Sequence, residues 1–390
     1  MSDASFKPLA GVRVLEFGQI VTAPFCALLL ADFGADVVKV ENPEGGDGMR
    51  QWPPMMAAEE GGERYSGNFA ALNRNKRSIV ADLKDAAQVA RLRELCASVD
   101  IVLENFRPGV MERLGLGYEA LRALHPRLVY CSLTGYGQTG PYAKKGAFDV
   151  TVQAISGVMS VTGEEDGPPV KCGVPVADFT AGLYAAYTSL AAYEQAKRTG
   201  QGTHVDCAML ACMLGISGLQ ISEYFGNGVA PKRLGSAHPR NAPYQGFEAR
   251  DRPFTIAAGN DKLWGEVCAA VGMPVLKDDP RFVTQGLRAR NQRALAAILQ
   301  PCFAERDAAD WLTEFDRRGV PCAPVNDYAA IMADRHVAEM GIVHDIELPN
   351  GVHTPAVVYP VRMKGYAFQP GARPPALGEH TEEVYAQWLS

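Results

Sequence analysis

One aspartate, Asp178, stands in a segment suited to covalent chemistry. It lies in residues 173–182 (GVPVADFTAG), where small and apolar residues surround its carboxylate. A helix-like pattern follows over residues 181–197, so Asp178 falls near a helix N-terminus. A partly desolvated carboxylate at such a position can serve as a nucleophile, although a plain N-cap aspartate has the same sequence signature. The segment alone leaves both interpretations open.

Four basic groupings follow predicted strands or stand in loops, and they could bind an anionic ligand. They are Arg50, the run 73–77 (NRNKR), Arg107 with Arg113, and Lys144 with Lys145. Glycine-rich turns at 105–109 and 135–141 also follow predicted strands, and glycine lets a backbone approach a ligand closely. Several cations at one edge of a sheet would suit a multiply phosphorylated ligand, although each single one is also an ordinary surface charge.

Short apolar segments alternate with helical patterns through the first half of the chain. Strands are predicted at 12–17, 36–41, 78–83, 101–106 and 128–133, and helices at 23–33, 86–97 and 118–124. This alternation indicates βαβ units and a mostly parallel sheet covered on both faces. In such folds ligands bind at the carboxyl ends of the strands. The fold class is therefore α/β.

The length of 390 residues favours two domains, because single cores rarely grow beyond about 300 residues. Pro, Gly and aromatic residues crowd 224–247, followed by a predicted strand at 254–258 and helical segments. We expect a large domain over 1–225, an inserted smaller domain over 226–325, and a return to the large domain over 326–390. A strand at 357–363 and a helix at 379–389 are predicted in that last part.

Composition excludes several classes of protein. A net charge of −6 argues against a nucleic-acid partner, and no apolar run or signal-peptide core indicates a membrane segment. The nine cysteines form no C-x-x-C pair or zinc-like cluster, so reduced thiols, no metal and a cytoplasmic location are expected. The first predicted strand is followed by GQIVTAP, which lacks the dinucleotide and P-loop fingerprints. A nicotinamide oxidoreductase is therefore disfavoured.

An ordered set of motifs spans nearly the whole chain and resembles family III CoA-transferases, the CaiB/BaiF family, which also includes α-methylacyl-CoA racemases. The motifs are 8–17 (PLAGVRVLEF), 34–41 (GADVVKVE), 73–78 (NRNKRS), 104–109 (ENFRPG), 135–137 (GYG), 176–178 (VAD) and 377–381 (LGEHT). On this resemblance Asp178 falls on the catalytic aspartate of the family.

The resemblance implies a Rossmann-like large domain with an inserted smaller α+β domain, in an interlocked homodimer. Coenzyme A or acyl-CoA is expected as a substrate, with no tightly bound cofactor. The implied CoA contacts are Arg50, Lys76, Asn105, Phe106, Arg113 and Lys145.

One position separates the two chemistries of the family. The racemases carry a Gly-His-Asp triplet whose histidine moves the α-proton, whereas this chain reads Ala147-Phe148-Asp149. Phenylalanine cannot transfer a proton, so CoA transfer through Asp178 is favoured over racemisation. Asp149 is expected near the site, with a structural role equally open. The turn at Gly259 and Asn260 resembles the mobile glycine loop of the family.

The acceptor is predicted from residues 235–245 (GSAHPRNAPYQ), which resemble the subgroup acting on short dicarboxylates, such as succinate–hydroxymethylglutarate (glutarate) CoA-transferase. His238 and Arg240 could meet a distal carboxylate, or could simply be turn or interface residues. Succinyl-CoA is the expected donor. Two alternatives remain: a 2-methylacyl-CoA racemase, and a CoA-binding relative that has lost its chemistry.

Overall fold

The computed structural model describes residues 7–366, 368 and 371–390, and within them six strands form one parallel sheet. The spatial order is β5-β2-β1-β6-β7-β8. The bounds are β1 Arg13–Phe17, β2 Asp36–Glu41, β5 Lys76–Val80, β6 Ile101–Glu104, β7 Val129–Thr134 and β8 Thr203–Ala208. The order reverses direction between β1 and β6, which pair from Val14 opposite Ile101 to Phe17 opposite Glu104. This is the doubly wound arrangement, which places a ligand crevice beside that pair.

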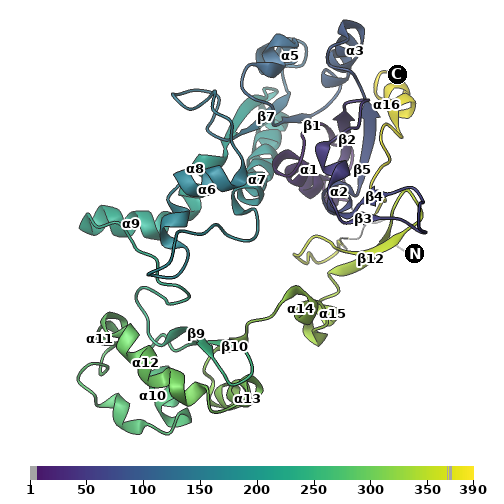
Figure 1. Ribbon diagram of the computed structural model, residues 1–390. Coiled ribbons are helices and arrows are strands. Elements are labelled where there is room, and N and C mark those ends of the chain that lie inside the picture. The colour runs from purple at the N-terminus through teal and green to yellow at the C-terminus, as the bar shows by residue number, and fades with distance from the viewer. Residues whose placement is uncertain (1–6, 367, 369–370) are drawn as a thin grey trace. The chain divides into compact units, whose positions relative to one another are not determined.

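Helices cover both faces of this sheet because successive side chains of each strand point to opposite sides. Val14 belongs to the core shared with α1 and α7, whereas Leu15 belongs to the core shared with α3 and α16. The first face carries α1 (Thr22–Asp32), α6 (Asp149–Ile155), α7 (Val176–Thr199) and α8 (Met209–Ile216). The second carries α3 (Ala86–Cys96), α4 (Val110–Arg113), α5 (Tyr118–Arg122) and α16 (Thr381–Trp388) (Figure 1).

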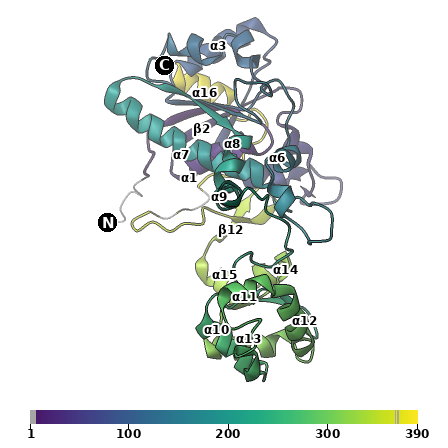
Figure 2. The same cartoon turned by 90° about the vertical axis from the view of Figure 1, so that its left-hand side faces the viewer.

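Helices α1 and α7 pack unusually closely, and a glycine makes this possible. A Cβ built on Gly182 of α7 would lie 2.8 Å from the Phe25 ring and 3.0 Å from the backbone oxygen of Thr22. Ala181 and Ala185 of α7 are fully buried beside it. Figure 2 shows α7 running as a long helix beside α1 and the sheet. Small residues therefore bring the start of α7 against the start of α1.

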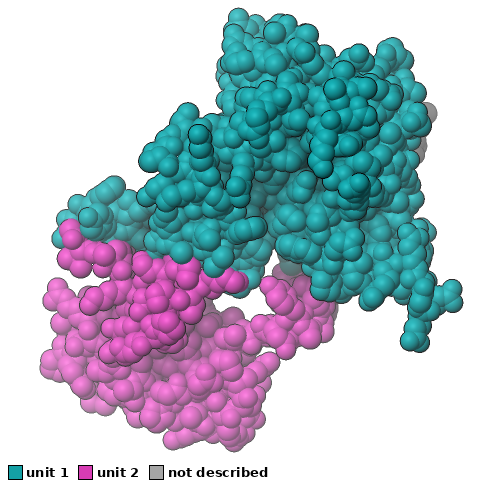
Figure 3. Space-filling view, turned by 45° about the horizontal axis from the view of Figure 1, so that its top comes forward, with its two compact units in different colours: residues 1–158, 172–227, 340–390 teal, residues 159–171, 228–339 magenta. Residues whose placement is uncertain are grey.

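The chain divides into two compact units. Unit 1 comprises residues up to 158, 172–227 and 340–390, and unit 2 comprises 159–171 and 228–339 (Figure 3). Unit 1 also contains α2 (Gly67–Asn73), α9 (Gly218–Asn227) and the strand pairs β3–β4 (Met55–Met56, Tyr65–Ser66) and β12–β13 (Val343–Glu347, His353–Val357). The expected domain limits were 225 and 325, whereas the compact units divide at 227 and 339, and residues 159–171 also belong to unit 2.

Unit 2 is built on an antiparallel sheet of order β11-β10-β9. Its core is aromatic: Phe254, Phe303 and Phe315 are fully buried, with Phe303 and Phe315 packed on Trp311 and Phe254 packed on Phe303. The strands are β9 Tyr244–Glu248, β10 Pro253–Ala257 and β11 Cys322–Pro324. The helices are α10 Asp261–Ala270, α11 Gln285–Arg290, α12 Gln292–Phe303, α13 Ala308–Arg318, α14 Tyr328–Met332 and α15 Arg335–Met340.

The α/β class and the parallel sheet are confirmed, and the predicted strands of the first half occur within a few residues of their expected positions. Two details differ. Strand β8 was not predicted, because THVDCA alternates polar and apolar residues rather than forming an apolar run. The strand expected at 357–363 is wrong, since β13 ends at Val357. No helix among the described residues is long and apolar enough to cross a bilayer.

Candidate active site

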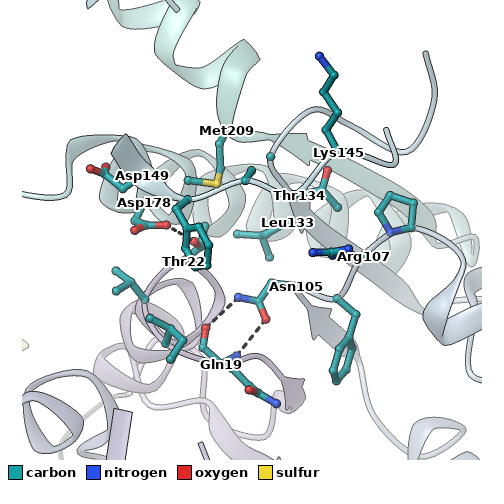
Figure 4. A pocket seen from close by; sticks show the side chains of 18 of the residues that line it. Gln19, Thr22, Asn105, Arg107, Leu133, Thr134, Lys145, Asp149, Asp178 and Met209 are labelled. Atoms are coloured by element: carbon teal, nitrogen blue, oxygen red, sulfur yellow. Dashed lines mark hydrogen bonds between the residues drawn. The ribbon is translucent and has the colours of Figure 1, made fainter. Parts of the chain in front are cut away.

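A cavity of about 330 Å³ opens in unit 1 at the carboxyl ends of β1, β6 and β7. Its lining comes from the loops after these strands together with the starts of α1, α6, α7 and α8. It includes Gln19, Ile20, Thr22, Asn105, Phe106, Arg107, Thr134, Lys145, Gly146, Phe148, Asp149, Asp178 and Met209 (Figure 4). The crevice expected from the strand order thus contains the aspartate singled out by the sequence.

Asp178 lies in the first turn of α7 and is not its cap. The helix begins at Val176 with Pro175 as N-cap, earlier than the predicted start at 181. The Asp178 carboxylate faces α1, where its Oδ1 accepts a hydrogen bond of 2.6 Å from the hydroxyl of Thr22. The interpretation as a capping aspartate is therefore wrong.

The pKa of Asp178 is raised from 3.8 to about 6. Burial is the largest cause, because it disfavours the charged form, and the nearby charge of Asp149 acts in the same direction. The Thr22 hydrogen bond opposes both by stabilising the anion. A carboxylate shifted by burial and a like charge inside a cleft is typical of functional sites. It is still mostly ionised at pH 7.

Asp149 fixes the start of α7 beside the Asp178 carboxylate (Figure 4). Its Oδ1 accepts the backbone N–H of Ala177 at 2.8 Å, and its Oδ2 accepts the side-chain amide of Gln153 at 2.6 Å. Both oxygens are therefore engaged in holding secondary structure. Asp149 combines a positioning role with an electrostatic one.

The loop 18–22 brings Thr22 to the cavity and is held from several sides. The side chain of Asn105 makes two hydrogen bonds of 2.9 Å to the backbone of Gln19, and Asp47 accepts the N–H of Ile20 at 3.1 Å. Ile20 has a φ of 68°, a left-handed conformation that costs a β-branched residue free energy. Surrounding bonds impose this strained geometry where the loop meets the pocket.

Two cations at the cavity are available to an anionic ligand. Among the described residues, none forms a hydrogen bond or ion pair with the guanidinium of Arg107, which lies against Gly146. Lys145 is exposed and its ammonium lies 3.7 Å from the centre of the Tyr142 ring. Lys145, Asn105 and Phe106, three of the predicted CoA contacts, thus line the cavity, and their contact with CoA stays a prediction.

Three other predicted CoA contacts lie outside the residues that line this cavity. Lys76 is buried, and its ammonium donates to Glu16, to the Pro24 carbonyl and to Asn73. Burial lowers its pKa to about 8. Arg50 is paired with Glu41 at 2.7 Å and borders a separate hollow, and Arg113 ends α4 on the surface. The placement of Lys76 corrects its expected role, because its donors are occupied inside the protein.

The predicted residues of the small domain all lie in unit 2. His238 stacks on Tyr244, and its Nδ1 accepts the N–H groups of Arg240 and Asn241 at 3.1 Å, which is the geometry of a turn residue. Asn260 caps α10 by accepting the N–H of Leu263 at 2.9 Å, and Gly259 precedes it. Their roles toward a substrate stay predictions.

Thr22 is the functional candidate that sequence reasoning missed. It stands 156 residues before Asp178, and a single hydroxyl in an apolar helix start gives no local signal. Phe148, by contrast, was singled out in the sequence because phenylalanine has no acid–base capacity. It is 78% exposed and borders the cavity, and no histidine is among the described residues that line it.

Comparisons with known proteins identify the family of this chain. The family model for CoA-transferase family III matches residues 9–381. The succinate–glutarate CoA-transferase of Agrobacterium fabrum is 39% identical over 381 residues, covering 97% of this chain and 95% of that protein. The succinyl-CoA:mesaconate CoA-transferase of Haloarcula hispanica is 37% identical, covering 96% and 95%.

A solved structure is similar over its whole length. The crystal structure of a CAIB/BAIF family protein from Brucella suis superposes with a TM-score of 0.88 at 40% identity, covering 98% of this chain and 99% of that one. The resemblance read from the motifs is thereby confirmed. The chain belongs to CoA-transferase family III and is an enzyme that transfers CoA.

Proposed function

We propose that this enzyme transfers CoA from succinyl-CoA to a short dicarboxylic acid through an aspartyl-CoA thioester on Asp178. The observation that carries the proposal is a partly buried carboxylate with a pKa of about 6, placed in the crevice at the strand ends beside two available cations. Relatives named for glutarate and mesaconate support a C4–C6 dicarboxylate as acceptor.

The chemistry needs one nucleophile and no external acid or base. An Asp178 oxygen attacks the thioester carbonyl of succinyl-CoA, and the C–S bond breaks to give a mixed anhydride and CoA thiolate. The thiolate then attacks Cγ of Asp178, which releases succinate and leaves the aspartyl-CoA thioester. An acceptor carboxylate attacks Cγ in turn, expels the thiolate and forms a second anhydride. Thiolate attack on its acyl carbon gives the product and regenerates Asp178.

Arg107 and Lys145 are proposed to hold the anionic parts of CoA near Asp178. A guanidinium without an internal partner binds phosphate without first breaking an ion pair, and its planar donors suit phosphate oxygens. Asn105 acts through the backbone of Gln19, because both ends of its amide are engaged there. His238, Arg240, Gly259 and Asn260 remain candidates for contacts with the acceptor.

Racemisation is the weaker candidate. It requires an acid or base on each face of the α-carbon, and Phe148 stands where a histidine would be needed. A carboxylate that accepts an acyl group needs no such partner. Formation of both epimers of a 2-methylacyl-CoA without exchange of CoA would overturn the proposal.

A homodimer is proposed as the assembly. Helix α9 contains no buried residue, and its large apolar side chains Leu219 and Phe225 are 65% and 78% exposed. Leu183, Tyr187 and Ile216 on α7 and α8 are exposed as well. This amount of apolar surface on neighbouring helices is typical of an interface between subunits.

Replacing Asp178 tests the nucleophile. We expect Asp178→Asn to abolish formation of glutaryl-CoA from succinyl-CoA and glutarate. Mass spectrometry of the CoA esters measures this reaction. The native protein incubated with succinyl-CoA alone should gain the mass of CoA less one water on the peptide containing Asp178. Exchange of CoA at the native rate in Asp178→Asn would disprove the covalent role of Asp178.

The same variant should be more stable than the native protein, so inactivity will not reflect misfolding. The pKa of Asp178 rises from 3.8 to about 6, with burial as the largest cause, and this net rise costs the folded state about 3 kcal/mol above pH 6. An uncharged amide removes most of that cost. A higher melting temperature at pH 7.5 is therefore the expected control result, and the difference should shrink as the pH falls below 6.

A further inference from the structure

The Thr22 hydroxyl is the group within hydrogen-bonding distance of Asp178 that the sequence did not indicate. The 2.6 Å bond joins the first residue of α1 to the first turn of α7 (Figure 4). Thr22 is only 6% exposed, so water competes little for this hydroxyl. The bond engages Oδ1 of Asp178, and no hydrogen bond from the described residues engages Oδ2.

We infer that Thr22 is a positioning residue that selects Oδ2 of Asp178 as the attacking oxygen and stabilises the negative charge that develops on Oδ1. This rests on the proposed function, since it presupposes that Asp178 forms the thioester. The first part follows from the geometry: an oxygen held by a 2.6 Å hydrogen bond is the poorer nucleophile, and the other oxygen is left free.

The second part follows from the reaction. When Oδ2 carries the acyl group of the mixed anhydride, Oδ1 is the carbonyl oxygen on Cγ. Thiolate attack on Cγ moves the carbonyl electron pair onto Oδ1, and the Thr22 O–H already points at that atom. A preorganised donor at a developing oxyanion is a large contribution in acyl transfer. The same bond serves when the acceptor carboxylate attacks the thioester.

The backbone keeps Thr22 in this position. Asp47 fixes the N–H of Ile20, and the ammonium of Lys39 donates to the Gly18 carbonyl at 2.6 Å. Gly182 lets α7 approach the Thr22 carbonyl to a distance that no side chain would allow. The hydroxyl therefore reaches Asp178 from a rigid support rather than from a mobile loop.

A Thr22→Val variant tests the inference because it keeps the shape and removes the hydroxyl. At saturating succinyl-CoA and glutarate we expect the rate to fall by roughly 10²-fold, as for loss of one oxyanion donor. Loss of this hydrogen bond also raises the pKa of Asp178, so the acidic limb of the pH–rate profile should move to higher pH. Thr22→Ser should restore both rate and profile to near native values.

Thr313→Val, on the exposed side of α13, removes a hydroxyl elsewhere and should leave rate and profile native. A native rate and profile in Thr22→Val would overturn the inference. Equal impairment of Thr22→Ser and Thr22→Val would also overturn it, because the methyl group and not the hydroxyl would then matter. These outcomes leave the proposed function intact. An active Asp178→Asn variant, in contrast, would show that Asp178 is not the nucleophile and would overturn the proposed function.

Discussion

At the scale of residues, the site depends on keeping a carboxylate ionised but poorly solvated. Burial and Asp149 raise the pKa of Asp178, and Thr22 lowers it. The balance leaves the anion dominant near pH 7 while removing part of its hydration, which favours attack on a thioester. The partly desolvated anion lowers the stability of the folded protein, as is usual for active sites.

The acidic limb of the pH–rate profile should report this balance. Exchange should fall as the pH drops through about 6, because protonated Asp178 cannot attack. Asp149→Asn removes a like charge and should lower the Asp178 pKa, so the limb should move to lower pH, opposite to the shift in Thr22→Val. Its amide oxygen can still accept the Ala177 N–H, so the plateau rate should stay within about tenfold of native. A limb unchanged in both variants would show that another group titrates.

At the scale of elements, the site depends on how α1 and α7 meet. Gly182 of α7 packs against Phe25 and Thr22 of α1, and the buried ions nearby fix the loop 18–22. Lys39 lies 3.0 Å from Glu16 and 2.9 Å from Asp47, while Lys76 binds the other oxygen of Glu16 at 2.8 Å. Such buried pairs contribute little net stability but strongly penalise any rearrangement that separates them. They define the loop geometry that the cavity requires.

Gly182→Ala should damage the site without changing any polar group. The added methyl would meet the Phe25 ring and the Thr22 carbonyl at 2.8 and 3.0 Å, so α7 must shift away from α1. We expect a stability loss of about 1–3 kcal/mol in urea unfolding, together with a rate loss from the lengthened Thr22–Asp178 bond. Gly286→Ala in α11, where nothing lies within 4 Å of the added carbon, is the matched control and should be near native. Equal behaviour of the two variants would contradict the close-packing argument.

At the scale of the whole molecule, apolar side chains on α7, α8 and α9 remain exposed in the single chain. Burying a side chain the size of phenylalanine is worth about 1.5–3 kcal/mol, so a partner subunit that covers several of them gains considerable free energy. The enzyme is accordingly expected to work as an assembly.

Phe225→Asp should weaken that assembly. A charge placed in an apolar interface loses its hydration without gaining a partner, so the variant should shift toward the mass of a monomer in light scattering. Val275→Asp in unit 2, at a side chain that is also 73% exposed, is the control and should keep the native mass. A Phe225→Asp protein of unchanged mass would indicate that α9 lies outside any interface.

The sequence by itself determined the α/β class and the family, and it singled out Asp178 as the candidate nucleophile. Alternating apolar runs and helical patterns are local properties of the chain, and βαβ units follow from them. The motifs around Asp178 and Asn105 are contiguous, so they could be read without knowledge of contacts. The preference for CoA transfer over racemisation rested likewise on a single residue type at Phe148.

Only the tertiary structure decided which side chains lie at the cavity and which are enclosed elsewhere. Residue type does not tell a buried ion from an available one, so Lys76 and Arg107 look alike in the sequence although one is enclosed by three partners and the other is not. The sequence also did not show that Asp178 lies within α7 rather than capping that helix. The Thr22 contact joins residues 156 positions apart, and such a bond exists only because α1 and α7 pack through Gly182. Chemistry that depends on one hydroxyl reaching one carboxylate is therefore decided by packing.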